Sequence, residues 1–235
     1  MRKFSLATLL VVLPTLLGAP TGSFAGNEGF TDSFRLDECN FKTRGRNPYF
    51  ILEPGYQLIF EGEEGKEFVR LGITVLNETR TIAGVKTRVV EEVEYHDSQL
   101  AEISRNYFAI CDPTNSVFYF GEDVDNYEDG EIVSHDGSWR AGEDGASPGI
   151  MMPGTVLLGS RYFQEFAPDV ALDRAEILSL SEVVETPADT FEDVLKTVET
   201  TPLEPNAKEY KFYAPGVGLI QDGTLKLVGY SAFLL

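Results

Sequence analysis

Short runs of apolar and β-branched residues, separated by turn residues, cover most of the chain. Residues 56–60 follow the turn dipeptide Pro54-Gly55, and residues 68–76 are rich in branched apolar side chains. Residues 85–95 alternate in part between apolar and charged side chains, and we expect the long charged side chains to face solvent. Each pattern is typical of a β-strand.

Further short strands are predicted along the rest of the chain. They lie at residues 100–110, 117–120, 131–134, 162–166, 175–184, 194–199, 209–213, 219–221 and 224–233. Turn pairs such as Ala83-Gly84, Asp129-Gly130 and Asp222-Gly223 fall between them. We therefore predict a mainly β fold with few short helices, a single antiparallel meander that curls into a partial barrel or sandwich.

Two segments also fit helical structure. Residues 172–180 contain good helix formers, so they could form a helix instead of a strand. Residues 186–196 could carry one helical turn. No longer stretch shows a convincing 3.6-residue period.

The first 25 residues are typical of a signal peptide. Arg2-Lys3 precede an apolar stretch over residues 4–17, and Ser23 and Ala25 suit the −3 and −1 positions of a signal-peptidase site. The alternative is an amphipathic first helix of the fold. We expect export to the periplasm or the extracellular space, and no integral membrane segment after cleavage.

The rest of the chain shows no clear linker. We expect residues 26–47 to form an irregular N-terminal arm and residues 48–235 a single β domain. Within it, residues 121–160 are rich in glycine and acidic residues and contain few strand formers, so we expect a long loop. A loop of that length in a compact domain is either functional or disordered.

Cys39 and Cys111 are the chain's two cysteines. In an oxidising compartment an even number of cysteines favours a disulfide. A bridge that closes a loop of about 70 residues stabilises a protein by about 3–5 kcal/mol on the chain-entropy model. The alternative is two buried free thiols.

The charge balance excludes some classes of partner. The net charge is −19, and it becomes −21 without Arg2 and Lys3 of the signal peptide. Such a polyanion repels phosphate backbones and anionic lipid surfaces. We therefore expect no nucleic-acid partner.

An acidic run opens the predicted loop. Six carboxylates lie within residues 122–131, and four of them, Asp123, Asp125, Asp129 and Glu131, are candidate metal ligands. Oxygen ligands of this kind suit Ca²⁺, but the spacing does not match an EF-hand. The alternative is a solvated acidic surface. We expect that the chain requires no cofactor.

The next stretch gathers rare residues. Candidate ligand-binding residues are His135, Trp139, Arg140, Met151 and Met152. Trp139 could form an apolar wall and Arg140 a clamp for an anion or carboxylate. The alternative is a segment that covers one end of the barrel, with Trp139 and both methionines filling the core.

Enzymatic chemistry has little local support, so whether the protein is an enzyme stays open, with a non-enzyme favoured. The chain has no G-x-S-x-G nucleophile motif, phosphate-binding loop or dinucleotide fingerprint, and we assign no catalytic residue. His135 with nearby carboxylates could support metal-assisted hydrolysis. The sequence therefore favours an exported, soluble, non-enzymatic binding or envelope-accessory protein that holds a cation or small apolar ligand near residues 121–154. A metal-assisted hydrolase and a purely structural interaction domain are the alternatives, and the small-molecule or protein partner is not identified.

Several motifs resemble those of a known group. They are N-P-Y-F-x3-P-G (47–55), N-S-V-F-Y-F-G-E-D (115–123), S-W-x-A-G (138–142), P-x2-T-F-x2-V-L (187–195) and Y-A-P-G-V-G (213–218). Together they resemble a family of uncharacterised exported bacterial β-proteins. The resemblance implies an antiparallel, barrel-like fold and an envelope or extracellular location, with no established activity. Within these motifs we expect Phe50, Phe120, Phe191 and Tyr213 to be core aromatics.

Overall fold

The computed structural model describes residues 29–232, so the predicted signal peptide lies outside the described residues. One 3-10 turn, η1 (Leu36–Glu38), precedes the strands. The strands are β1 (Phe41–Lys42), β2 (Gly45–Asn47), β3 (Phe50–Leu52), β4 (Tyr56–Glu64), β5 (Glu67–Ile82), β6 (Val85–His96), β7 (Gln99–Cys111), β8 (Ser116–Glu128), β9 (Glu131–Ser134), β10 (Trp139–Arg140), β11 (Ser147–Met152), β12 (Arg161–Phe163), β13 (Glu165–Phe166), β14 (Arg174–Glu185), β15 (Thr190–Thr201), β16 (Glu204–Ala214), β17 (Gly218–Asp222) and β18 (Leu225–Ala232).

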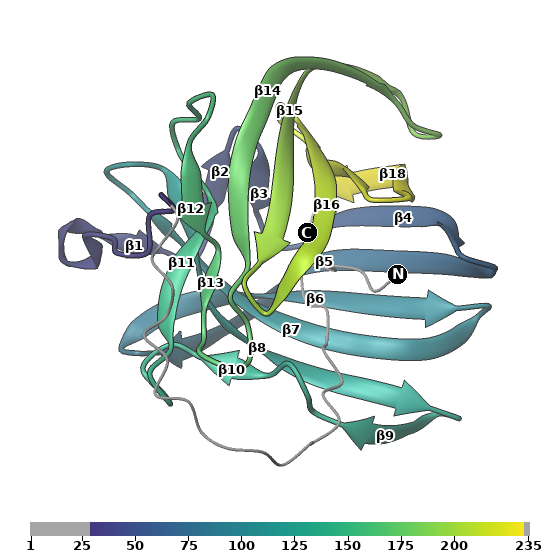
Figure 1. Ribbon diagram of the computed structural model, residues 1–235, viewed down its shortest axis with the longest axis horizontal. Helices are drawn as coiled ribbons and strands as arrows, with labels where there is room; N and C mark the ends of the chain where they lie inside the picture. Colours follow the sequence, from purple (N-terminus) through teal and green to yellow (C-terminus); the bar gives the residue numbers. More distant parts are fainter. Residues whose placement is uncertain (1–28, 233–235) are drawn as a thin grey trace.

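One large antiparallel sheet dominates the fold (Figure 1). Its order is β12-β14-β15-β16-β17-β18-β4-β5-β6-β7-β8-β11-β13. Outside this path, β1 pairs with β7, and both β9 and β10 pair with β8. The path curls so that β11 and β12, near its two ends, come into contact. The result is a nearly closed barrel, with β2 and β3 as a small second sheet, which confirms the predicted antiparallel β fold.

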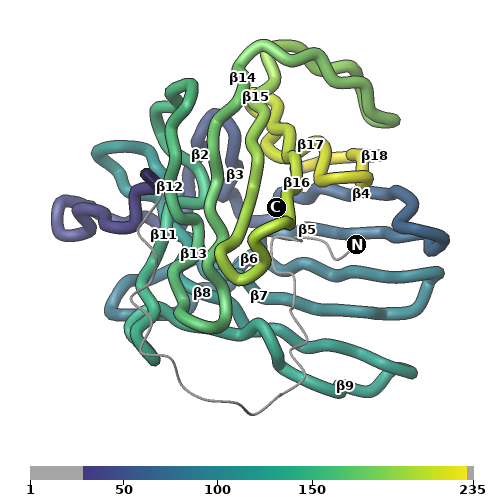
Figure 2. The backbone as a smooth tube through the Cα atoms, in the orientation of Figure 1, coloured from purple at the N-terminus to yellow at the C-terminus, as the bar shows by residue number. Residues whose placement is uncertain are grey.

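The two halves of the barrel enclose the core. In Figure 1, β14, β15 and β16 cross in front of β4 to β8 at a steep angle. Figure 2 shows the tip of the β14–β15 hairpin projecting from the barrel. Directly paired residues share a face of a sheet, so Leu227, Phe60 and Leu71 form one inward row across β18, β4 and β5. Each is at most 1% exposed.

The core aromatics lie where the sequence predicts. Phe120 and Tyr213 are buried, and Phe191 is buried at the edge of the core. Phe50 is half-buried and packs against the same core cluster. Period-two burial explains Tyr213, whose neighbour Phe212 is less buried, whereas β8 is buried on both faces around Phe120.

The prediction of a long loop over residues 121–160 is wrong for half of these residues, which lie in strands. β8 continues to Glu128, and β9, β10 and β11 follow it. Val124 is buried, whereas Asp123 and Asp125 on the opposite face of β8 are only half-buried. The acids therefore mark the outer face of a strand and not a loop.

The two helical alternatives are also wrong. Residues 172–180 fall mostly in β14, and residues 190–196 belong to β15. These strands pair with each other over most of their length. Ala175 and Ile177 are fully buried on either side of the partly exposed Glu176. This period of two is that of a strand, so tertiary packing overrides the helix propensity of these residues.

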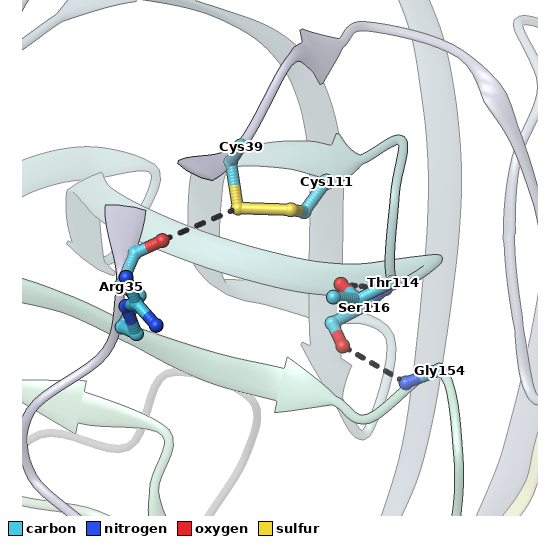
Figure 3. The surroundings of a disulfide bond; sticks show 6 residues. All are labelled: Arg35, Cys39, Cys111, Thr114, Ser116 and Gly154. Carbon is cyan, nitrogen blue, oxygen red and sulfur yellow. Dashed lines mark hydrogen bonds between the residues drawn. A yellow bond between two sulfur atoms is a disulfide. The ribbon is translucent and has the colours of Figure 1, made fainter. Parts of the chain in front are cut away.

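Figure 3 shows the disulfide that joins the N-terminal arm to the barrel. Cys39 and Cys111 are bonded with a Cα–Cα distance of 4.9 Å and a sequence separation of 72, which confirms the predicted bridge. Next to it, Phe41 of β1 pairs with Cys111 at the end of β7. The bridge and this pairing together fix the arm against the sheet.

Figure 3 also shows how the segment after β11 is held. Gly154 N–H donates to Ser116 Oγ over 3.0 Å. A Cβ at Gly154 would lie 1.8 Å from Thr114 O, so only glycine allows this approach. The turn between β7 and β8 therefore closes against the end of β11.

Candidate functional site

A groove of about 420 Å³ lies beside the second half of β8, and we call it the β8 groove. In Figure 1 this region is where β8, β9 and β10 lie together. Its titratable lining residues are Arg105, Glu122, Asp123, Asp125, His135, Arg140, Glu143 and Asp144. Apolar side chains of Ala146, Ala167, Pro168 and Val170 line the same groove. The groove thus gathers residues that lie far apart in the chain.

The groove exists because β8 changes partners at Gly121. Before it, Val117 to Tyr119 pair with β11, and after it β10 and β9 take over. Gly121 has φ +127°, a conformation that L side chains rarely adopt, and a Cβ there would lie 2.3 Å from Trp139 O. Glycine at this position therefore lets β10 lie against β8.

Asp123 and Asp125 share the outer face of β8 because they are two residues apart. Asp123 accepts hydrogen bonds from Arg140 and, over 2.6 Å, from the Tyr107 hydroxyl. Arg105 donates to Asp125 over 3.4 Å. Arg105 also lies 3.2 Å from Glu91. Two arginine–carboxylate pairs therefore lie next to each other in the groove.

These pairs shift the titration of their members. Burial raises the pKa of Tyr107 to about 12, and its bond to Asp123 adds to the effect. Partial burial lowers the pKa of Arg140, but the Asp123 carboxylate more than offsets this, so the net shift is upward. Arg140 stays charged at every accessible pH.

His135 is oriented by the same strand. Its Nδ1 lies 2.8 Å from Asp125 Oδ1 and 3.0 Å from Val124 O. Both partners are acceptors, so Nδ1 carries the proton and Nε2 is the nitrogen left to act as a base or ligand. The side chain is 67% exposed. The structure thus brings the predicted histidine to one of the predicted carboxylates.

The four candidate metal ligands do not come together. Asp129 lies in the exposed turn between β8 and β9, and Glu131 begins β9. Strand geometry places Asp129 about 20 Å along the chain from Asp123. Among the described residues, no group of three His, Cys, Asp or Glu side chains is arranged to hold a metal ion.

Trp139, Met151 and Met152 belong to the core, as the alternative interpretation of these residues has it. They are 5%, 2% and 1% exposed. Trp139 also lines the β8 groove, and its ring meets the buried ring of Tyr119 edge-on with centroids 5.4 Å apart. Of the five candidate ligand residues, His135, Trp139 and Arg140 therefore line one groove, and the two methionines do not.

A second feature, not predicted from the sequence, is a set of buried polar side chains across the barrel. We call it the interior polar network. Its members are Glu92, Asn106, Glu122, Gln164, Glu165, Glu199, Lys211 and Asp222, all at most 4% exposed. Lys211 Nζ lies 3.0 Å from Glu199 Oε2 and 3.3 Å from Asp222 Oδ2. Gln164 donates to Glu199 over 2.9 Å.

Burial raises the pKa of several of these acids. It raises the pKa of Glu92 to about 8, against the opposing effect of Lys211. It raises the pKa of Asp222 to about 6, again opposed by Lys211. The pKa values of Glu122 and Glu165 lie well above the usual range, first through burial and then through neighbouring carboxylates. Lys211 remains the cation of the network, because its carboxylate partners outweigh its own burial.

The expectation for residues 85–95 is therefore wrong at Glu92, which faces the interior. A sequence signal for the network did exist at Lys211. Tyr213 is a predicted core aromatic, and Lys211 lies two residues earlier on the same strand. Period-two alternation puts both side chains on the same face.

Comparisons with known proteins add little to this picture. No protein-family model and no curated protein matches the chain. One solved structure, of a candidate lipoprotein from Parabacteroides distasonis ATCC 8503, aligns with 80% of this chain and 100% of its own. The TM-score is 0.37 at 12% identity, and such a likeness carries no conclusion about function. In the described part of the chain, no helix has the length and apolar character needed to cross a membrane.

Proposed function

We propose that this chain is an exported, non-enzymatic binding protein that holds a small polyhydroxylated ligand in the β8 groove. The observation that carries the proposal is the pair of arginine–carboxylate contacts, Arg140 with Asp123 and Arg105 with Asp125, in one groove of about 420 Å³. Ligand pockets commonly have volumes of about 300–1,000 Å³.

The chemistry of the groove fits a sugar-like molecule. Each ion pair presents N–H donors beside carboxylate acceptors, and neighbouring hydroxyl groups can donate to one and accept from the other. Pro168 and Val170 offer apolar surface for the C–H face of a sugar ring. The arginines are already paired, so the groove has no uncompensated guanidinium that demands an anionic ligand.

Export is supported by two features. The Cys39–Cys111 bridge suits an oxidising compartment. The first 25 residues have the charge, apolar stretch and small residues of a signal peptide. Membership of the exported β-protein family named above also remains part of the proposal. N-terminal sequencing of the protein recovered from a bacterial periplasm tests export. A mature chain that still begins at Met1 would contradict export through a cleaved signal peptide.

Saturation-transfer NMR with glucose, maltose and inositol tests the ligand class. We expect transfer to at least one of these molecules, and loss of it in the double variant Arg140→Ala/Asp123→Ala. The matched control is Arg161→Ala/Glu176→Ala, which removes an ion pair of 2.9 Å that does not line the groove. Absence of transfer, or equal transfer in both double variants, would leave a purely structural interaction domain as the better description.

A second candidate function rests on His135. Its contact of 2.8 Å with Asp125 orients the ring as hydrolases orient a general base. We therefore keep a hydrolase, with or without added metal, as the alternative. Ester hydrolysis that is lost in both His135→Ala and Asp125→Asn, with and without added Zn²⁺ or Ca²⁺, would favour it. Activity unchanged in His135→Ala would exclude this residue.

A further inference from the structure

A second cavity, away from the β8 groove, is lined by residues of β3 to β7, β11, β16 and β17. It has a volume of about 40 Å³, which is room for about three water molecules or a group of similar size. The aromatic residues that line it are Tyr49, Phe50, Tyr56, Phe108 and Tyr213. We call it the aromatic cavity.

Two of the sequence motifs meet at this cavity. Tyr49 and Phe50 come from the motif at 47–55, and Tyr213 and Val217 from the motif at 213–218. The two segments are joined by Gly216 N–H, which donates to Pro48 O over 2.7 Å. Neither motif contributes to the β8 groove, so this cavity gives them a common location.

Two of the three tyrosine hydroxyls at the cavity already have partners. Tyr56 OH donates to Val217 O over 2.9 Å. Tyr213 OH donates to Glu199 Oε1 over 3.5 Å, at the limit of a hydrogen bond. The rings, and not the hydroxyls, are therefore what these residues offer to a ligand.

One carboxyl group interrupts the apolar lining. Glu92 lines the cavity and is 3% exposed. Its Oε1 accepts from Asn106 Nδ2 over 3.3 Å, whereas Oε2 has no hydrogen-bond partner among the described residues. No Lys, Arg or His of residues 29–232 lines the cavity. A buried polar atom without a partner is costly, so Oε2 marks a place for a donor.

We propose that the aromatic cavity binds a small alkylammonium group, with Glu92 Oε2 as the acceptor of its N–H and the aromatic rings around its alkyl carbons. Aromatic rings attract cations through their quadrupole, and the attraction strengthens in a desolvated site. The buried Glu92 carboxylate supplies the counter-charge that a buried cation requires.

Binding of this kind displaces a proton. Groups that act on Glu92 are Lys211 from β16, Asp222 from β17, Glu102 from β7 and Glu94 from its own strand. Burial holds the pKa of Glu92 at about 8, so at neutral pH its carboxyl is mostly protonated. The ammonium keeps its proton, Glu92 releases its own to solvent, and the two form an ion pair. The affinity should therefore rise with pH.

Methyl NMR on the whole protein labelled at methionine tests the proposal with n-propylammonium chloride as the probe. Met151 lines the cavity and its neighbour Met152 does not, so one methyl reports binding and the other is an internal control. Met152→Leu assigns the Met152 signal and Met151→Leu the Met151 signal among the three methionines of the chain. We expect a saturable shift of the Met151 methyl only, with an affinity at least about tenfold higher at about pH 8.5 than at about pH 6. No saturable shift would overturn the proposal.

Two comparisons define the chemistry. 1-Propanol, the uncharged match, should bind at least about tenfold more weakly than propylammonium at the higher pH, and Glu92→Gln should remove this difference. Equal binding of both probes, or an unchanged ammonium affinity in Glu92→Gln, would overturn the proposal. If Glu92→Gln does not fold, Phe50→Leu at the half-buried edge of the cavity serves instead. A loss of a few fold for propylammonium and not for 1-propanol supports the proposal, and equal effects contradict it.

Discussion

Lys211 and Glu199 form an ion pair inside the barrel, with Nζ 3.0 Å from Oε2 and side chains 1% and 5% exposed. They lie on neighbouring strands but are not directly opposite, because Lys211 pairs with Thr197. On the other side, Lys211 lies opposite Asp222 of β17 and 3.3 Å from its carboxylate. One cation thus joins carboxyl groups from the two strands that flank β16.

Removal of this cation should be strongly destabilising. Lys211→Met leaves Glu199 and Asp222 buried without their partner, and breaking a buried pair in this way typically costs about 3–5 kcal/mol. Urea unfolding followed by circular dichroism measures the loss. The control is Lys208→Met on the same strand, where the side chain is exposed and the expected change is within about 0.5 kcal/mol. Equal stability of the two variants would contradict a structural role for the pair.

The stability of the fold should fall as pH rises from about 4.5 to about 8. The pKa of Glu92 is about 8 in the folded protein, against the ordinary value of 4.5 that applies to the unfolded chain. The folded state therefore binds more protons than the unfolded chain across this pH interval. Unfolding then becomes easier as pH increases, by about 4 kcal/mol at most from this residue. Thermal melts between about pH 4.5 and 9 follow the trend.

Glu92→Gln isolates this contribution. The amide cannot ionise, so the variant should lose most of the pH dependence above pH 5 that Glu92 contributes. Glu91→Gln is the matched control, because Glu91 is only half-buried on the opposite face of β6, next to Arg105. A wild-type slope in Glu92→Gln would show that the pKa of this carboxyl is not raised in the folded protein.

The disulfide between Cys39 and Cys111 leads to predictions about thiol reactivity and stability. Denatured, unreduced protein should contain no thiol that reacts with Ellman's reagent, because Cys39 and Cys111 are bonded. Cys39→Ser/Cys111→Ser should unfold about 2–5 kcal/mol more easily, since the unfolded chain loses a long closed loop. Two reactive thiols before reduction would contradict the bond.

Most of the fold could be predicted from the strand pattern of the sequence, because the alternation of side chains and the turn residues act locally. Asp222-Gly223 predicts a hairpin between residues 219–221 and 224–228, and β17 and β18 pair there. The loop residues are Gly223 and Thr224, one position later than expected, since Asp222 itself pairs with Leu225. The predicted turns at Ala83-Gly84 and Asp129-Gly130 lie between paired strands, with positive φ at all four residues.

The candidate site could be predicted only in part. The turn at Asp129-Gly130 folds β9 back on β8, and a register shift then pairs Asn126 with Ser134. The next residue along, His135, reaches Asp125 as a result. The turn can be identified in the sequence, but no residue pattern there marks the register shift, near which Ser138 Oγ accepts a hydrogen bond from Val124 N–H over 2.8 Å. The interior polar network was missed because charged residues were assigned to the wet face by type and not by their position relative to Tyr213.

The geometry at Gly121 gives a last prediction. Gly121→Ala should push β10 away from β8, because the new Cβ would lie 2.3 Å from Trp139 O at φ +127°. The control is Gly130→Ala, where φ is +82° but no atom lies within 4 Å, so only backbone strain of about 1 kcal/mol is added. We expect Gly121→Ala to cost at least about 2 kcal/mol more than this control. Trp139 is the single tryptophan of the chain and is 5% exposed, so its emission should shift to the red in Gly121→Ala and stay unchanged in Gly130→Ala. Identical emission in both variants would contradict the assignment of Gly121 as the residue that holds the β8 groove in shape.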